Sequence, residues 1–165
     1  MKYLEFTDVE IHELKSEIIG ETFEILVKQP DPQILSLFGN KPLPVVYGTD
    51  ANLSAGGYIN TLEGLLLGGE IPPVLFIGIR YKLGDEPDFM QFATSRTREF
   101  TPTEDVENQK LMEQMTLREV KGGGAENFLK FLTTELRDWV SERFNVSDDT
   151  TSVSYTHLRA HETSE

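Results

Sequence analysis

Residue types that could carry out chemistry are sparse in this chain of 165 residues. It has no cysteine, which excludes disulfides, thiolate metal sites and thiol nucleophiles. Of its histidines, His157 and His161 lie close to the carboxyl end, and His12 has no candidate nucleophile beside it in the sequence. Acidic pairs such as Asp148-Asp149 show no metal-ligand spacing and are typical of a solvated surface. We therefore expect no metal and no cofactor.

Two short motifs resemble sites without meeting their requirements. Residues 52–56 (NLSAG) come closest to the Gly-x-Ser-x-Gly elbow that exposes a nucleophilic serine, but Asn52 replaces the first glycine. Ser54 is therefore interpreted as a polar residue near a helix start. Residues 122–124 are three glycines before a predicted helix, and no Lys-Ser/Thr pair follows them as a phosphate-binding loop requires. We interpret them as a hinge-like loop.

The charge balance narrows the class of partner. The chain has 28 Asp and Glu against 15 Lys and Arg, a net charge of −13. Nucleic acids and anionic membranes attract basic surfaces, so we expect neither as a partner. No run approaches the roughly 18 apolar residues of a membrane span, and the start lacks the apolar region of a signal peptide. A soluble cytoplasmic protein is the expectation.

Hydrophobic periodicity and glycine and proline positions predict a series of strands and helices. The expected order is a β-hairpin over residues 11–30, a loop over 30–44, a strand over 45–47, a helix over 56–67, a strand over 74–79, mostly loop over 81–123 with a short helix near 105–115, and a helix over 125–144. No strand is expected after that helix. This order predicts an α/β fold in which a parallel sheet has just begun.

Four stretches together resemble α/β-hydrolases of the putative-esterase type, the group of esterase D-like and enterochelin esterase-like serine hydrolases. They are LPVVYGTDAN (43–52), LLLGGEIPPVLFIGIRY (65–81), RTREFTPTED (96–105) and GGGAENFLKFLTTELRDWVSERFNV (122–146). The resemblance covers most of residues 20–150. It implies the truncated amino-terminal half of an α/β-hydrolase, with an N-terminal hairpin, the start of the parallel sheet and flanking helices.

The resemblance also implies site residues. The family donates a backbone N–H to an oxyanion hole from the turn after the third strand, here Ala51 and Asn52. Ala51 stands where the family usually has glycine, so it would be strained if the position needed a positive φ. Arg98, or less favourably Arg96, could contact a substrate carbonyl or carboxylate. The alternatives are an ordinary capped turn and an exposed Arg98 that pairs with a neighbouring glutamate. The family's nucleophile, acid and histidine are not found in this sequence.

The end of the chain has an unusual sequence. Residues 153–163 (VSYTHLRAHET) match, residue for residue, one translation frame of a transposon-based sequencing adapter. We therefore interpret residues 1–152 as a partial hydrolase domain and residues 153–165 as a non-native tail that includes His157 and His161. On this interpretation, the strand over 45–47 has an unpaired edge and the chain folds marginally.

These inferences favour an inactive fragment of a serine carboxylic-ester hydrolase whose substrate is a small-molecule ester. A non-catalytic α/β binding or interaction module and a fragment of an acyltransferase on the same scaffold are the alternatives. The sequence does not distinguish an esterase from an acyltransferase, because the access of the acyl acceptor depends on loops that the resemblance does not cover.

Overall fold

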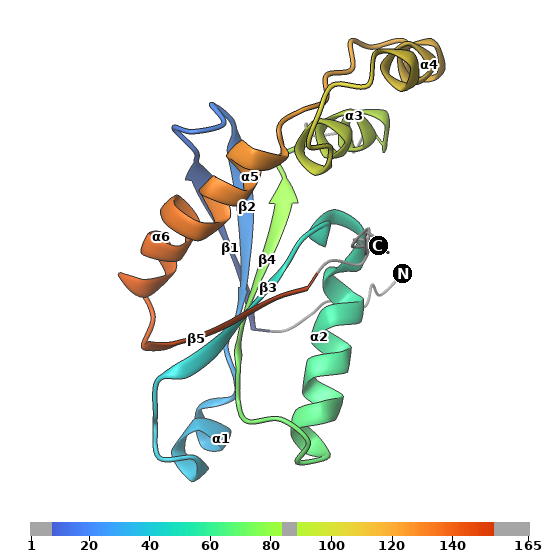
Figure 1. Cartoon of the computed structure of the whole chain (residues 1–165). Coiled ribbons are helices and arrows are strands. Elements are labelled where there is room, and N and C mark those ends of the chain that lie inside the picture. The colour runs from blue at the N-terminus through green and yellow to red at the C-terminus, as the bar shows by residue number, and fades with distance from the viewer. Residues whose placement is uncertain (1–7, 84–88, 154–165) are drawn as a thin grey trace, which may run out of the picture. The chain divides into compact units, whose positions relative to one another are not determined.

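The computed structural model of the chain describes residues 8–83 and 89–153, which form helices around a five-stranded sheet (Figure 1). The strands are β1 (Val9–Lys15), β2 (Thr22–Lys28), β3 (Leu43–Gly48), β4 (Leu75–Tyr81) and β5 (Val146–Val153). The helices are α1 (Pro32–Leu37), α2 (Ala51–Leu67), α3 (Phe89–Phe100), α4 (Val106–Thr116), α5 (Ala125–Phe131), the π-helical segment η1 (Leu132–Leu136) and α6 (Arg137–Ser141). The predicted α/β class is therefore confirmed.

The strand order is β1-β2-β4-β3-β5, and β3 runs parallel to both of its neighbours. Contacts divide the described chain into two compact units. One comprises residues 8–12, 25–80 and 145–153, and the other comprises residues 13–24, 81–83 and 89–144.

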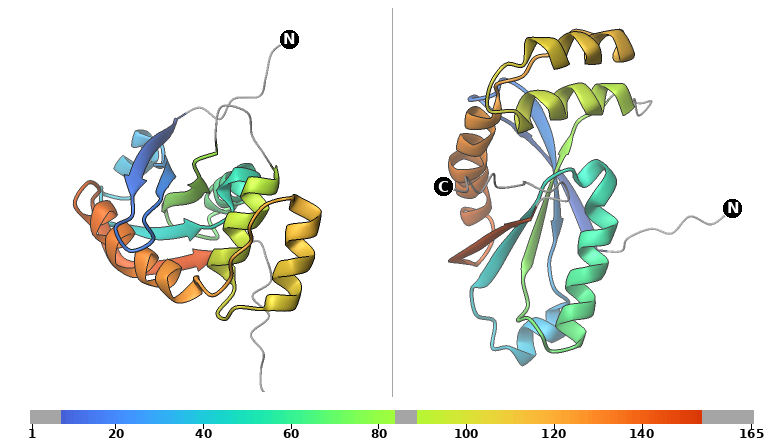
Figure 2. Two further views of the ribbon diagram at one scale, coloured as in Figure 1. Left: turned by 90° about the horizontal axis from the view of Figure 1, so that it is seen from above. Right: turned by 45° about the vertical axis from the view of Figure 1, so that its right-hand side comes forward.

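The first unit is built on the parallel strands, with α2 lying along one face (Figure 2). Its centre contains side chains that are 0–1% exposed: Ile25, Val27, Val45, Leu75 and Ile77. The continuous apolar run of β4 is typical of a strand with both faces covered. The strands predicted at 45–47 and 74–79 are confirmed, and the helix predicted at 56–67 begins five residues earlier, at Ala51.

The expectation that no strand follows the last helix was wrong. Residues 146–153 form β5, which pairs with β3 from Leu43↔Val146 to Gly48↔Val153. The backbone ladder of β3 stabilises this polar segment although it lacks an apolar alternation. Between Leu43 and Val45 the register shifts, since Val45 pairs with Thr150. Pro44 stands at this shift, where its missing N–H removes no regular ladder bond. The prediction that the strand at 45–47 has an unpaired edge was also wrong, because β5 pairs with β3 along that edge.

The short helix predicted near 105–115 is confirmed as α4, but two stretches predicted as loop contain the helices α1 and α3. Within 30–44, α1 begins after Asp31, whose carboxylate accepts the N–H of Gln33 at 2.7 Å, and has proline at its first position. No residue of α1 is buried, so it gives no apolar periodicity. Within 81–123, α3 buries only Phe92 and Glu99. A buried glutamate interrupts the pattern by which a helix is predicted, and α3 was missed for this reason.

The second unit is held by aromatic packing. Phe23 of β2 stacks on Phe131 at 4.7 Å between ring centroids, and Phe128 packs against both. The predicted helix over 125–144 is confirmed as the consecutive segments α5, η1 and α6, which end at Ser141. Helices α3 and α4 lie side by side in this unit (Figure 2). The predicted hairpin is also confirmed, with its first strand at Val9–Lys15.

Candidate functional site

The turn between β3 and α2 is the first candidate site. β3 ends at Gly48, α2 begins at Ala51, and the residues between them, Thr49 and Asp50, are 3% and 5% exposed. Because β3 is a parallel strand, this turn lies at the carboxyl edge of the sheet, where α/β proteins place their ligand sites. The turn is thus buried and lies at the carboxyl edge of the parallel strands.

Small residues allow α2 to approach the sheet at this turn. Gly48 and Gly78 are register partners on β3 and β4. A Cβ atom at Gly78 would lie 3.1 Å from the Cβ of Ala51, and one at Gly48 would lie 2.7 Å from a ring carbon of Phe76. Real Cβ atoms essentially never come as close as 2.7 Å to another heavy atom. The glycine pair therefore fixes where the first turn of α2 begins.

The backbone conformation of the turn corrects one expectation about Ala51. Ala51 is the first residue of α2 and has no positive φ; the left-handed residue is Asp50, at φ 56° and ψ 29°. Aspartate tolerates this region better than most residues because of its short polar side chain. Ala51 is therefore unstrained, and its small side chain matters for its contact with the position of Gly78.

The first turn of α2 presents backbone donors. The carbonyl of Asp50 accepts the N–H groups of Leu53 and Ser54 at 2.9 and 3.0 Å. The N–H groups of Ala51 and Asn52 precede these bonds, among the helix-start donors that have no acceptor within the helix. The positive end of the dipole of this 17-residue helix lies at the same place. The turn thus presents backbone N–H groups at the start of a helix, and Ser54 lies within that helix rather than on a strand-to-helix elbow.

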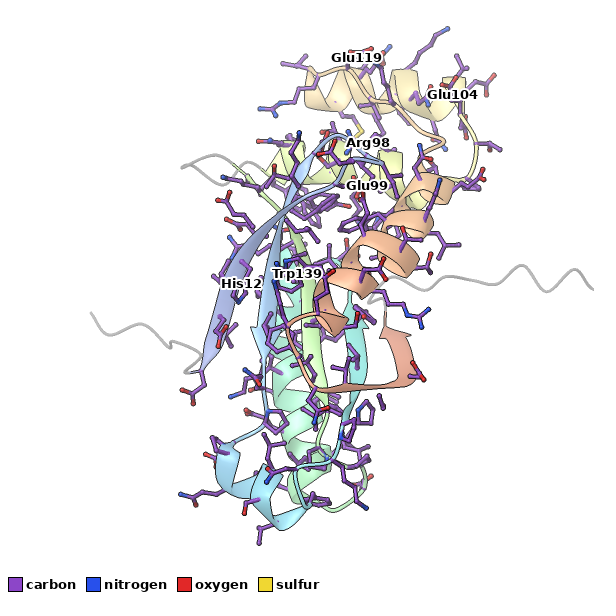
Figure 3. The ribbon with its side chains drawn as sticks, turned by 90° about the vertical axis from the view of Figure 1, so that its left-hand side faces the viewer. His12, Arg98, Glu99, Glu104, Glu119 and Trp139 are labelled. Atoms are coloured by element: carbon purple, nitrogen blue, oxygen red, sulfur yellow. The ribbon has the colours of Figure 1, made fainter. Side chains whose placement is uncertain are left out.

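Arg98 lies in a second, separate cluster within the other unit. Its guanidinium contacts Glu21 at 2.5 Å through one terminal nitrogen and Glu99 at 2.7 Å through the other. Figure 3 shows Arg98 and Glu99 together on α3. The expected pairing with Glu99 is confirmed, but it is not an exposed pair: the side chain of Glu99 is 1% exposed and that of Arg98 is 29% exposed.

Burial and pairing shift the protonation of this cluster. Desolvation raises the pKa of Glu99 to about 7, although the hydrogen bond with Arg98 favours its ionised form. The hydrogen bond with Glu21, followed by that with Glu99, raises the pKa of Arg98, so its charge is permanent. A contact between Arg98 and substrate stays a prediction, and such a contact would involve a guanidinium already held by two carboxylates.

The glycine run at 122–124 packs against the end of α3. The N–H of Gly124 donates to the carbonyl of Arg98 at 2.8 Å, and that of Gly123 donates to the hydroxyl of Thr101 at 3.0 Å. A Cβ at Gly124 would lie 2.8 Å from the same Arg98 oxygen, and Gly123 has φ +80°. These contacts anchor the loop that leads into α5, and its hinge-like role stays a prediction.

The remaining sequence candidates do not assemble into a site within the part of the chain that the structure describes. His12 lies on β1, with its ring Nε2 2.9 Å from Glu10. Arg96 lies over the ring of Phe100, 5.0 Å from its centroid. His157 and His161 lie outside the described residues. Over residues 8–83 and 89–153, no cluster of ligating side chains could hold a metal ion, and no helix is long and apolar enough to cross a membrane.

Only some of the residues of these two sites could be found from the sequence. The glycines at 48 and 78 were visible in the apolar runs, but their pairing depends on the strand register. Glu21 and Glu99 looked like surface acids, because nothing in a single sequence distinguishes a buried carboxylate from an exposed one. The resemblance found the turn at residues 51–52, and periodicity alone would not have done so.

Comparison with known proteins adds independent information about the fold. No protein-family model and no curated protein matches the sequence. Solved structures do match, among them the BES protein from Bacillus cereus (TM-score 0.66, 19% identity, 92% of this chain and 53% of that chain). An IroE-like serine hydrolase from Shewanella oneidensis matches with TM-score 0.67 and 22% identity, over 87% of this chain and 41% of that chain.

A third solved structure matches to a similar extent. The siderophore hydrolase EstB from Aspergillus nidulans matches with TM-score 0.64 and 20% identity, over 94% of this chain and 52% of that chain. The chain spans about half the length of these structures. At these identities the likeness establishes fold. The chain therefore has the same α/β fold as the matched part of these solved structures, over about two fifths to one half of their length.

Proposed function

We propose that this chain is part of a serine carboxylic-ester hydrolase and that its β3–α2 turn supplies one half of the oxyanion hole. The observation that carries the proposal is the position of the Ala51 and Asn52 N–H groups, at the carboxyl edge of β3 and at the start of α2. Solved hydrolases of the same fold, two of them described as serine or siderophore hydrolases, support the reaction class.

The proposed role of the Ala51 and Asn52 N–H groups is to stabilise the charge that develops during ester hydrolysis. When a serine attacks an ester carbonyl, the carbonyl oxygen gains negative charge in the tetrahedral intermediate. Fixed N–H groups aimed at that oxygen stabilise the charge without reorganising. At the β3–α2 turn, the glycine pair at 48 and 78 fixes the helix start, so the donors are held by packing and not by a mobile side chain. The expected substrate is a small-molecule ester.

The nucleophile is the part that this sequence does not supply. It contains no Gly-x-Ser-x-Gly motif, and we propose that the motif follows residue 152 in the gene. Alone, the chain is expected to release no product from a chromogenic ester and to take no label from a fluorophosphonate probe. A burst of product together with a labelled serine would contradict this assignment. A gene sequence past codon 152 without the motif within about ten codons would contradict the family assignment.

The role of the turn can be tested in an active fusion. Residues 1–152 would be joined to the part of the Bacillus cereus BES chain that this chain does not cover, and Ala51 would be replaced by lactic acid, so that an ester oxygen replaces its N–H. We expect kcat for ester hydrolysis to fall about 10²- to 10³-fold. The same change at Asn52 tests the second donor.

Leu53 provides the matched control for this backbone substitution. Its N–H already donates to Asp50 within the first turn of α2, so the ester analogue there loses a helix bond but no oxyanion donor. We expect kcat of the Leu53 analogue to stay within a few-fold of the unmodified fusion. An equal loss at Leu53 and at Ala51 would show that helix integrity, and not an oxyanion contact, explains the effect.

A further inference from the structure

A groove lies at the opposite edge of the first unit from the β3–α2 turn. It is lined by the last turns of α2, by α1, by Val74 just before β4 and by Phe76 within β4. Because α2 begins at the carboxyl edge of the parallel strands and runs back along the sheet, its last turns lie at the amino edge (Figure 1). The groove is therefore not the ester site.

The floor of the groove is apolar and only partly covered. Leu62 and Leu66 of α2 and Ile34 and Leu35 of α1 line it while remaining half-buried, although α1 has no fully buried residue of its own. The groove measures about 840 Å³. Pockets of roughly 300–1,000 Å³ hold small molecules. A ligand with an alkyl or aryl body would cover these four half-buried apolar side chains.

The rim of the groove is acidic. Among the described residues that line it, the carboxylates are Asp8, Glu10, Asp31 and Glu63, and the only cationic side chain is Lys28. Lys28 is 17% exposed and lies 3.3 Å from Glu63, so its charge is compensated within the groove. The charge of the rim favours a cationic ligand over an anionic one.

We propose that this groove binds a small amphipathic amine, with its apolar body on the floor of α1 and α2 and its protonated amine facing the carboxylates at the rim. The volume fits a small molecule, the floor supplies the apolar area, and the rim supplies the sign of the charge. This is a binding site separate from the ester chemistry, and it does not depend on the proposed function.

The first test uses the unaltered chain and calorimetric titration with n-alkylamines from butylamine to octylamine. Affinity is expected to rise by up to about fourfold per methylene, because each buried methylene contributes about 0.8 kcal/mol. Octanoate, which has the same tail and the opposite charge, is expected to bind at least about tenfold more weakly than octylamine. Octanoate binding as tightly as octylamine, or binding of neither, would overturn the proposal.

A pair of variants on one helix locates the site. Leu66→Lys puts an ammonium into the groove and is expected to weaken octylamine binding about tenfold or more. Leu53→Lys makes the same change at a residue of α2 that is 65% exposed and outside the groove, and it should leave the affinity unchanged. Equal effects of the two variants would overturn the assignment. If Leu66→Lys does not unfold cooperatively, the comparison of octylamine with octanoate on the unaltered chain decides.

Discussion

The two candidate regions are held in place by different forces. At the β3–α2 turn, Gly48, Gly78 and Ala51 bring a helix start against two strands, with no ion pair among them. At the end of α3, Arg98 is held between Glu21 and Glu99, and one of those carboxylates is buried. The first arrangement depends on the size of side chains and the second on their charge.

Because of this difference, we expect the two regions to respond to different changes, one to added side-chain volume and the other to pH or to the removal of a charge. A geometry fixed by close packing resists changes of pH but not the addition of a methyl group. A geometry fixed by a buried charge pair depends on protonation and is strongly destabilised when one partner is removed. Variants and pH can therefore separate the two regions within one molecule, through its free energy of unfolding in urea.

The largest expected effect comes from removing the Arg98 charge. Arg98→Met leaves the buried Glu99 without its cation, and the free energy of unfolding at about pH 8 is expected to fall by about 3–5 kcal/mol. Arg96→Met is the matched control, because it makes the same change two residues earlier. That change removes a cation–π contact with Phe100, which is worth about 0.5–1 kcal/mol, and leaves no known buried carboxylate without its cation. Similar losses in both variants would show that the cluster is not held by charge.

The pH dependence of stability is the next largest effect. The pKa of Glu99 is raised from 4.5 to about 7 in the folded chain, so between these values the folded state binds more protons than the unfolded state. Stability from this group is therefore full below about pH 4.5 and is lost as pH rises to about 7, on the order of 3 kcal/mol in all. Glu99→Gln should remove this decline.

The measurement is the difference in the free energy of unfolding between Glu99→Gln and the unaltered chain, taken at several pH values. That difference should grow in favour of the glutamine variant from about pH 4.5 to 7 and then level off. Glu119→Gln replaces a carboxylate whose side chain is 73% exposed and should show no such trend. A difference for Glu99→Gln that is constant with pH would contradict a raised pKa.

Close packing at the turn predicts a smaller loss of stability that does not depend on pH. Gly48→Ala places a Cβ 2.7 Å from the Phe76 ring and 2.9 Å from the Tyr58 ring, and it is expected to cost about 1–3 kcal/mol at every pH. Gly57→Ala, within α2, meets nothing within 4 Å and should stabilise the chain by about 0.5–1 kcal/mol. If both glycines tolerate alanine equally, close packing does not fix the turn.

The elements that could be predicted from the sequence are those with an apolar signature of their own. β4 is a continuous apolar run, and the helix from Ala125 shows a regular stripe, so both were found with small errors at their ends. The missed elements, α1, α3 and β5, depend on caps, a buried carboxylate or a neighbouring strand. The pairing of β5 joins segments distant in the sequence, the cap of α1 is local, and apolar periodicity contains neither of them.

The candidate sites divide in the same way. Ala51 and Asn52 could be located from a family resemblance, because a turn after a strand is a local feature. The pairing of Arg98 with its sequence neighbour Glu99 was expected, and the burial of that pair was not. Glu21 is 77 residues from Arg98 in the chain, so its contact follows from the fold alone.

The smallest expected effect compares the left-handed residue of the β3–α2 turn with a left-handed residue at the end of α4. Leu117 ends α4 at φ 54° with 90% of its surface exposed, so Leu117→Gly relieves backbone strain and removes few contacts. It should stabilise the chain by up to about 1 kcal/mol in urea unfolding. Asp50 has nearly the same backbone, at φ 56°, but is 5% exposed, so Asp50→Gly also removes a buried polar side chain and should give no gain. Equal gains at both positions would mean that backbone strain outweighs side-chain contacts at the β3–α2 turn, and the turn would then be determined by the backbone rather than by packing.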